Sequence, residues 1–306
     1  MNKKIITALI ALILIVPTTT NSVAAEQVPT IAILDTALNT SLPIFKDRIT
    51  YEVCILEWNS CPNGKSFMEG PGSAGLPLSV ISKNGFNHGT NIASIFAENT
   101  NKFNIVFVRI IGNTFMGDRQ TTNEITIVNA LDWVIKNKTK YNIQAVSMSQ
   151  GHHNLAPLAD YCPKTPATQN KIKDLIAINV PTLMAVGNGS DYKRVDWPAC
   201  IDEAIGIGAS TPQDQFAIYS NYDPIKTDFI SIGQLTALDP NGKRINVRGT
   251  SASTIVAAAQ WLELKNAKPL LTHQQILDLF TKTSLPAKSS STFVAKLINL
   301  TAAING

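Results

Sequence analysis

Residues 29–35, Pro-Thr-Ile-Ala-Ile-Leu-Asp, indicate the fold of this chain of 306 residues. The run is continuously apolar, whereas a strand with one solvated face alternates between apolar and polar residues. It therefore predicts a strand that is buried on both faces of a parallel sheet. Ligands of open α/β sheets bind beyond the carboxyl ends of the strands, where Asp35 stands. Asp35 either begins a turn or belongs to a functional site, and its partners must decide between the two.

Further apolar runs alternate with helical segments along the chain. We expect strands at residues 105–111, 145–149, 182–186, 204–209 and 228–232, and helices at residues 87–97, about 167–179 and 251–264. Capping boxes at Thr121-x-x-Glu124 and Thr272-x-x-Gln275 open two more helices, and a short helix lies near the C-terminus. Such alternation predicts an α/β fold of three layers, with a mostly parallel, twisted sheet and helices on both faces.

Domain organisation is simple in this pattern. Residues 40–87 are rich in Pro, Gly, Ser and Asn, so we expect an irregular surface insertion there. The sequence has no linker and no internal repeat, which predicts one domain over residues 26–306. With 44% hydrophobic and 16% charged residues, the chain can bury a full core and is not disordered.

Residues 1–25 predict a secretory signal peptide. Lys3 and Lys4 precede an apolar run of 12 residues, 5–16, which is too short to span a bilayer as a helix. We expect cleavage after Ala25 and a secreted or periplasmic protein with no stable membrane association; an uncleaved anchor is the alternative. Without Lys3 and Lys4 the chain keeps 24 basic and 22 acidic residues, a balance that gives no footprint for nucleic acid.

The cysteines number four, an even count that suits an oxidising compartment. Four cysteines allow three pairings. We favour Cys54–Cys61 because that loop is short and local, and Cys162–Cys200 by elimination. The spacings contain no Cys-x-x-Cys pair, which argues against a zinc site.

Two expected helices begin with side chains suited to chemistry. Ser251 stands at the start of helix 251–264, where free backbone N–H groups favour a developing anion; the alternative is that Ser251 only caps the helix. His88 stands at the entrance of helix 87–97 and can serve as a base, or can be an ordinary polar residue. Together with Asp35 they supply a nucleophile, a base and an orienting acid.

The order Asp, His, Ser resembles that of the subtilisin-like serine peptidases. The segments that carry the resemblance span residues 31–305 and are Ala32-Ile-Leu-Asp35, His88-Gly-Thr90, Asn129-Ala-Leu-Asp-Trp133, Ser147-Met-Ser-Gln-Gly151, Ala185-Val-Gly-Asn188, Ser220-Asn-Tyr222 and Gly249-Thr-Ser251. Each motif alone is weak, but their order along the chain is specific. The resemblance implies a subtilisin-like fold and a serine endopeptidase that acts through an acyl-enzyme.

The resemblance also implies roles for individual residues. Ser251 would attack the peptide carbonyl, His88 would move its proton, and Asp35 would orient the imidazole. The Asn188 amide would hold the oxyanion. The residues expected to bind substrate are Ser149, Gln150, Gly151, Gly187 and Asp196.

Asp196 is placed by counting back from Trp197-Pro198, which is similar to an aromatic-Pro pair beside the family's primary pocket. Relatives that cut after basic residues have an acid at this position, so the resemblance implies a preference for Lys or Arg before the scissile bond. Alternatively, Asp196 pairs at the surface with Lys193 or Arg194.

Several positions depart from the family pattern. Asn91 stands where the family has a second His, Ala252 where it has Met, and Ile255 and Val256 where it has Pro-His. None of these changes removes a catalytic group. The segment after Ala25 begins only a few residues before the first strand, which we expect to leave no room for an inhibitory propeptide.

Two other classes of protein share parts of this pattern. A solute-binding protein has the same size and α/β alternation, and a catalytically silent subtilase-fold protein would act by binding alone. We expect polypeptide substrates, a monomer and no required cofactor. A structural calcium ion is common in the family, but no ligands can be assigned. His152 and His153 lack a third ligand, so we expect no metal there and solvated imidazoles.

Overall fold

The structure is a computed structural model that describes residues 27–83, 85–113, 118–288 and 293–306, so the expected signal peptide lies outside the described residues. Its strands are β1 (Thr30–Asp35), β2 (Ile49–Ile55), β3 (Phe67–Glu69), β4 (Asn104–Arg109), β5 (Ile143–Met148), β6 (Thr182–Ala185), β7 (Ile205–Ser210), β8 (Phe229–Ile232), β9 (Gln234–Leu238), β10 (Arg244–Arg248), β11 (Leu285–Lys288) and β12 (Val294–Leu297). Its helices are α1 (Leu78–Ile81), α2 (His88–Asn99), α3 (Glu124–Asn137), α4 (Pro166–Ala177), α5 (Thr250–Ala267), α6 (His273–Thr283) and α7 (Leu300–Asn305), with a short 3₁₀ helix at Pro43–Phe45.

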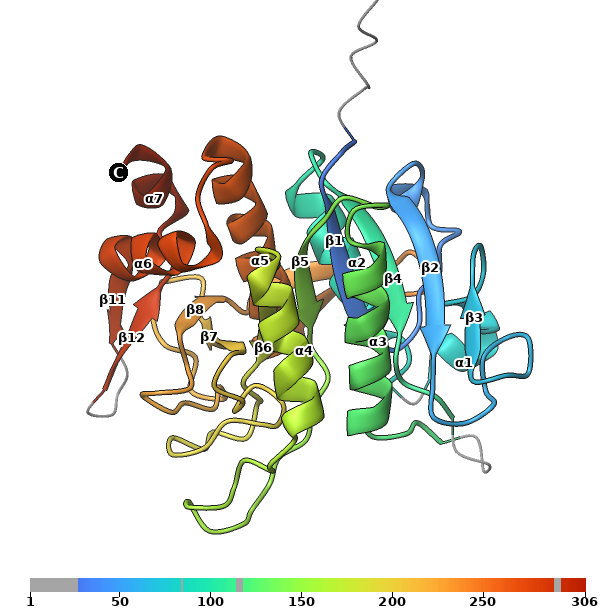
Figure 1. Cartoon of the computed structure of the whole chain (residues 1–306), viewed down its shortest axis with the longest axis horizontal. Coiled ribbons are helices and arrows are strands. Elements are labelled where there is room, and N and C mark those ends of the chain that lie inside the picture. The colour runs from blue at the N-terminus through green and yellow to red at the C-terminus, as the bar shows by residue number, and fades with distance from the viewer. Residues whose placement is uncertain (1–26, 84, 114–117, 289–292) are drawn as a thin grey trace, which may run out of the picture.

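Ten of these strands form one sheet, in the order β11-β12-β8-β7-β6-β5-β1-β4-β2-β3 (Figure 1). Neighbouring strands run parallel, except for the antiparallel pairs β2–β3 and β11–β12 at the two edges. β1 lies between β4 and β5, so the chain leaves β1 to one side first and returns to the other. Such a reversal opens a crevice at the carboxyl ends of the strands, and Asp35 lies at its edge.

Two separate cores cover the two faces of the sheet, as the continuously apolar strands predict. Ile31 and Ile33 of β1 pack in the core that contains α2 and α5. Ala32 and Leu34 point to the opposite face and pack in the core that contains α3 and α4. These two helices cross the face of the sheet that is turned toward the viewer in Figure 1. The expected three-layer α/β architecture is confirmed.

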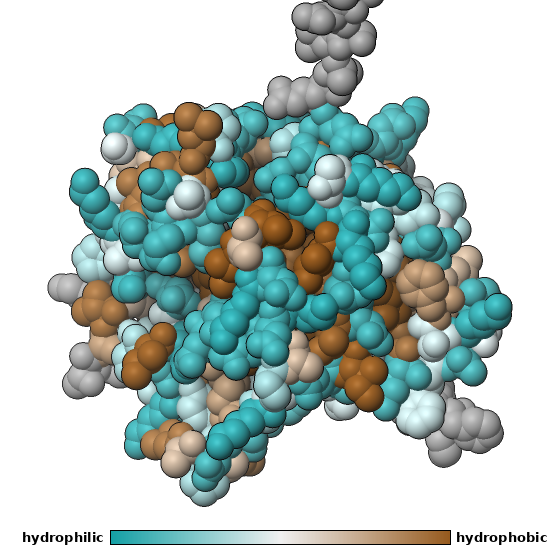
Figure 2. Space-filling view, viewed as in Figure 1, coloured by the Kyte–Doolittle hydropathy of each residue, from teal (hydrophilic) through white to brown (hydrophobic). Residues whose placement is uncertain are grey.

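The outer face of the α3 and α4 layer is largely hydrophilic, with apolar residues showing in small patches (Figure 2). Amphipathic helices that bury one side produce this distribution. Among the described residues, no helix combines the length and the apolar character that crossing a membrane requires.

The expectation of an irregular segment at residues 40–87 is wrong. β2, β3 and α1 lie in it, and β2 pairs directly with β4. This strand could not be predicted because a polar residue interrupts its apolar pattern. Glu52 lies inside β2, is 6% exposed, and accepts hydrogen bonds from the backbone of Gly72 and Ala74. The β9–β10 hairpin and the β11–β12 pair were likewise not predicted.

One of the two predicted capping boxes is wrong. α3 begins at Glu124, and its cap is Asn123, whose side chain accepts the Thr126 N–H at 2.9 Å. Asn caps a helix as well as Thr does, and it stands directly before the first helical residue. The box formed by Thr272 and Gln275 at the start of α6 is confirmed.

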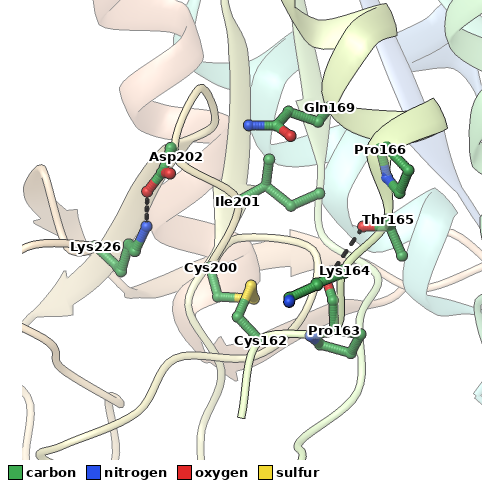
Figure 3. A pocket seen from close by; sticks show the side chains of 10 residues that line it. All are labelled: Cys162, Pro163, Lys164, Thr165, Pro166, Gln169, Cys200, Ile201, Asp202 and Lys226. Carbon is green, nitrogen blue, oxygen red and sulfur yellow. Dashed lines mark hydrogen bonds and ion pairs between the residues drawn. A yellow bond between two sulfur atoms is a disulfide. The ribbon is translucent and has the colours of Figure 1, made fainter. Parts of the chain in front are cut away.

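Both expected disulfides, Cys54–Cys61 and Cys162–Cys200, are present. The second ties the loop after β5 to the loop after β6. A hollow of about 410 Å³ lies against this bridge, with the ion pair of Lys226 and Asp202 on its rim (Figure 3). None of the candidate catalytic residues lines this hollow.

His273 gives the fold a predictable response to acid. The side chain is buried against Trp261, with 5.2 Å between ring centroids, and its Nδ1 has no hydrogen-bond partner among the described residues. Burial lowers the pKa of His273 to about 4. The unfolded chain therefore binds more protons between pH 6.5 and 4, and stability is lost as the pH falls through this range.

We expect the His273 contribution to the free energy of unfolding to fall by about 3 kcal/mol between pH 7 and pH 4. Urea denaturation of the wild type and of His273→Leu at both pH values measures it as a difference. The comparison is needed because burial raises the pKa of Asp228 to about 6, which acts in the opposite sense in both proteins. Equal pH dependence in the two proteins would contradict this account.

Candidate active site

Asp35 and His88 are brought together by the ends of β1 and α2. The carboxylate is fully buried, and His88 Nδ1 lies 2.8 Å from Oδ1 and 3.0 Å from Oδ2. The Thr36 N–H donates to the same Oδ1 at 2.7 Å. A carboxylate held in this way keeps a proton on Nδ1 and leaves the other ring nitrogen free to accept one.

Gly89 lets the start of α2 approach β1 this closely. A Cβ at this position would lie 2.6 Å from the Ala37 carbonyl oxygen and 2.7 Å from the Phe107 ring. The Gly89 N–H also donates to the Thr36 hydroxyl at 2.9 Å. The sequence His88-Gly89 is therefore the local cause of the contact between the imidazole and Asp35.

Ser251 is the second residue of α5, and it does not cap the helix. The cap position is Gly249, with φ 156° and ψ 161°, a conformation that essentially only glycine adopts. The Ser251 hydroxyl is instead directed at the carbonyl of Ser149, at 3.5 Å, while the Ser149 hydroxyl donates to the Ser251 carbonyl at 3.2 Å. The capping alternative is thus wrong, and the hydroxyl is available for other chemistry.

One cleft of about 440 Å³ is lined by most of the candidate residues. It is lined by Gly85, Asn87, His88, Asn91, Arg119, Ser149, Gln150, Gly151, Ala185, Gly187, Asn188, Asp196, Thr250 and Ser251. No hydrogen bond joins His88 to Ser251 in the described part of the chain. Contacts between a nucleophile and its base are often long without substrate and shorten when it binds.

Asn188 follows β6 and lines the cleft. Its Oδ1 accepts the Thr250 N–H at 2.8 Å and the Thr250 hydroxyl at 3.2 Å. These two donors fix which end of the amide is oxygen. The Nδ2 group makes no hydrogen bond to a described residue, so it can donate to an incoming oxygen beside the start of α5.

Gln150 has a role that sequence reasoning missed. It is expected from sequence only to bind substrate, but its side chain is 4% exposed, and its Nε2 donates to Asp35 Oδ1 at 2.9 Å. The same nitrogen lies 3.0 Å from His88 Nδ1, and the Gln150 Oε1 accepts from the guanidinium of Arg119. The one available signal was a polar residue directly after an otherwise buried strand.

Asp196 lies under Gly187 at one end of the cleft. A Cβ on Gly187 would be 2.3 Å from the Asp196 Cγ, so only glycine leaves this carboxylate open to the cleft. Asn221 Nδ2 and His153 Nδ1 lie 2.9 Å and 2.8 Å from Asp196 Oδ1. Burial raises the pKa of Asp196, and the neighbouring His153 opposes that rise.

The alternative pairing of Asp196 is wrong, because the Arg194 guanidinium binds Asp191 at 2.9 Å and no ion pair joins Lys193 to Asp196 among the described residues. His153 is exposed, as expected, but its imidazole also bridges Asp196 and Asp191, with Nε2 3.5 Å from Asp191 Oδ2. The loop after β5 folds back on Trp197 and carries His153 to the acids, a contact that short-range sequence patterns do not encode.

Nothing among the described residues forms a group of three or more His, Cys, Asp or Glu side chains suited to hold a metal ion. His152 packs its ring on Trp197, with 5.0 Å between centroids. The described residues give no calcium ligand set that could be assigned.

The chain is similar to known proteins both in sequence and in fold. Residues 27–297 match the family model Peptidase_S8, the subtilase family. The chain is 28% identical over 200 residues to subtilisin-like proteinase Mp1 of Magnaporthiopsis poae, covering 63% of this chain and 41% of that protein. It is 28% identical over 219 residues to subtilisin-like serine protease Pen c 1 of Penicillium citrinum, covering 68% and 51%. The chain thus spans about half the length of the curated relatives it matches.

Solved structures share the fold. The prenylagaramide maturation protease PagA is similar with a TM-score of 0.67 at 18% identity, over 92% of this chain and 93% of that chain. A cold-adapted subtilisin-like serine proteinase is similar with a TM-score of 0.59 at 20% identity, over 88% and 87%. At these identities the likeness concerns the fold alone.

Proposed function

The chain belongs to the subtilase family, and from that premise we propose that it is an exported serine endopeptidase. It hydrolyses peptide bonds through an acyl-enzyme formed on Ser251. The observation that carries this proposal is the pairing of His88 Nδ1 with the buried Asp35 carboxylate at 2.8 Å. His88 lines the same cleft as Ser251, whose hydroxyl does not cap α5. Asp35, His88 and Ser251 are the three groups that nucleophilic acyl transfer needs.

In the first half of the reaction, the Ser251 hydroxyl attacks the peptide carbonyl while His88 Nε2 takes its proton. Asp35 keeps the other nitrogen protonated and stabilises the imidazolium that forms. His88 then gives the proton to the leaving amine, and the C–N bond breaks to leave an ester on Ser251. A water molecule, deprotonated by His88, attacks that ester and releases the acid, which returns Ser251 and His88 to their starting states.

The oxyanion that forms in each half is held by two donors, the Asn188 Nδ2 group and the Ser251 N–H. The fixed orientation of the amide by Thr250, at 2.8 Å and 3.2 Å, supports this role, because a donor placed in advance costs no reorganisation during the reaction. Ser149, Gln150 and Gly151, at the end of β5, would pair with the substrate backbone as an added strand.

Export is supported by the two disulfides, which persist in oxidising compartments, and by the N-terminal sequence of residues 1–25. We propose a monomer, secreted or periplasmic, that acts on polypeptides, requires no cofactor and binds neither membranes nor nucleic acid. A structural calcium ion stays compatible with the family, without assigned ligands.

A silent binding protein of the same fold and a solute-binding protein are the competing proposals. Covalent labelling separates them from an enzyme, because a serine-directed phosphonate reacts only with an activated hydroxyl. We expect stoichiometric labelling of the wild type on Ser251 and none in Ser251→Ala. A folded wild-type protein that takes up no label would favour the binding proteins.

We further propose that Asp196 selects a cationic residue before the scissile bond. Its Oδ1 already accepts two donors, while Oδ2 has no hydrogen-bond partner among the described residues. Asp196 lines the cleft beside Gly187, where a Cβ would collide with the carboxylate. A partly buried carboxylate favours a cation and disfavours an aliphatic side chain that would leave it unpaired.

The expected result is a preference for Arg over Leu in matched peptides by at least about tenfold in kcat/KM, a factor that needs only about 1.4 kcal/mol. In Asp196→Gly the preference should shrink or reverse. The measurement is kcat/KM for both peptides on both proteins; equal values for the wild type, or a ratio that Asp196→Gly leaves unchanged, would discard the assignment.

A further inference from the structure

An imidazole partly covers the carboxylate at the end of the cleft. His153 Nδ1 lies 2.8 Å from Asp196 Oδ1, and the two side chains are 29% and 18% exposed. Asp196 lines the cleft together with Gly187 and Ser251, whereas His153 does not line it. A substrate side chain beside Asp196 would therefore meet a carboxylate that His153 already contacts.

The other charges that face His153 are few. Its Nε2 lies 3.5 Å from Asp191 Oδ2, and that same oxygen is already paired with Arg194 at 2.9 Å. His152 is the adjacent residue, but its ring packs on Trp197. Asp191 and Arg194 compensate each other, so the charge left next to the Asp196 carboxylate is that of Asp196 and His153 together. Arg119, a cation that lines the cleft, binds Gln150.

We propose that His153 sets the charge of this part of the cleft, so that selection of a cationic residue before the scissile bond is strong only when His153 is neutral. The inference rests on the peptidase function proposed above. A neutral imidazole donates Nδ1–H to Asp196 and leaves one negative charge facing the substrate. A protonated imidazole makes the same hydrogen bond as an ion pair, and the net charge facing the substrate is zero.

The geometry supports a change of charge without a change of shape. Nδ1 is the donor in both protonation states, so the ring need not turn when it gains its second proton. Asn221 also donates to Asp196 Oδ1, at 2.9 Å, and to the Val186 carbonyl, at 3.1 Å, which holds the carboxylate in place in either state. Only the attraction for a cation differs between the two states.

The coupling is reciprocal. An imidazolium and a substrate guanidinium compete for one carboxylate, so each weakens the binding of the other by the same factor. Typical couplings between sites are about 5-fold to 150-fold, and we expect about tenfold because both charges stay partly solvated.

The test compares two peptides that differ only in arginine or citrulline before the scissile bond. Citrulline has the shape of arginine without its charge, and the titration of His88 affects both peptides equally and cancels in their ratio. We expect the arginine-to-citrulline ratio of kcat/KM to rise about tenfold between pH 5.5 and 8.5 in the wild type. In His153→Asn, which can donate to Asp196 but cannot be protonated, the ratio should be high and independent of pH.

His152→Asn is the matched control, because it removes the neighbouring imidazole that does not bind Asp196, and it should keep the rise. Cleavage of the citrulline peptide at pH 8.5 shows that each variant is folded. A flat ratio in the wild type, or a rise that survives in His153→Asn, would overturn the role of His153 while the peptidase stands. If the folded wild type cleaves neither peptide and takes up no phosphonate, the peptidase proposal fails and this inference fails with it.

Discussion

Ser251→Ala should lower kcat by about 10⁶-fold, the size of the loss that removal of this serine causes in subtilisin itself. In the proposed mechanism the hydroxyl oxygen bonds to the carbonyl carbon, so without it the acyl-enzyme cannot form. Residual hydrolysis of about 10³-fold over the uncatalysed rate should remain, because Asn188 and the backbone donors still stabilise the attack of water. Initial rates on a peptide substrate, with melting curves as a check of folding, measure both numbers.

A sharper test compares Ser251→Ala with His88→Ala and with the double variant. If Ser251 and His88 act as one unit, His88→Ala should cost about as much as Ser251→Ala, and the double variant should cost no more than either. In the wild type, activity should rise with pH as His88 loses its proton, because only the neutral ring accepts the proton of Ser251. Ser41→Ala, at an exposed serine outside the cleft, is the control. Losses that simply multiply in the double variant would show that the two residues act independently.

The central part of the fold could be predicted from sequence because its signal is local and strong. Residues 31–34 of β1 form a continuous apolar run, and all six residues of the strand are buried, as a strand covered on both faces requires. The edge of the sheet could not be predicted in this way, because β2 contains the buried Glu52, whose carboxylate accepts a hydrogen bond from the backbone of Gly72, twenty residues away. A hydrogen bond between such distant residues produces no periodic pattern of apolar and polar residues in the sequence.

The candidate site likewise contains residues that local sequence patterns predict and contacts that they do not. Asp35 stands at the end of a predictable strand, and His88 and Ser251 stand at the starts of predictable helices. Gly89, next to His88, allows the close approach to β1 that a Cβ would prevent. The contacts of Gln150 and of His153 depend on side-chain direction and on a loop that returns to Asp196 from 43 residues away. Only the three-dimensional arrangement reveals these contacts.

Asn188→Ala should lower kcat by about 10² to 10³-fold and leave KM nearly unchanged, as loss of this donor does in subtilisin. The amide has its oxygen engaged by Thr250, at 2.8 Å and 3.2 Å, so its Nδ2 group is free to meet the oxygen that becomes negative in the transition state. The neutral carbonyl of a bound substrate gains far less from that donor. The loss should therefore fall on kcat and not on binding.

Asn188→Asp makes the test specific to donation. The carboxylate keeps the shape of the amide but replaces a donor by a negative charge, so it should lower kcat at least as much as alanine does. Asn241→Ala, at an exposed asparagine in the β9–β10 turn, should leave kcat unchanged. A loss confined to KM, or an aspartate variant as active as the wild type, would exclude Asn188 from the oxyanion site and assign the stabilisation to the backbone N–H groups at the start of α5.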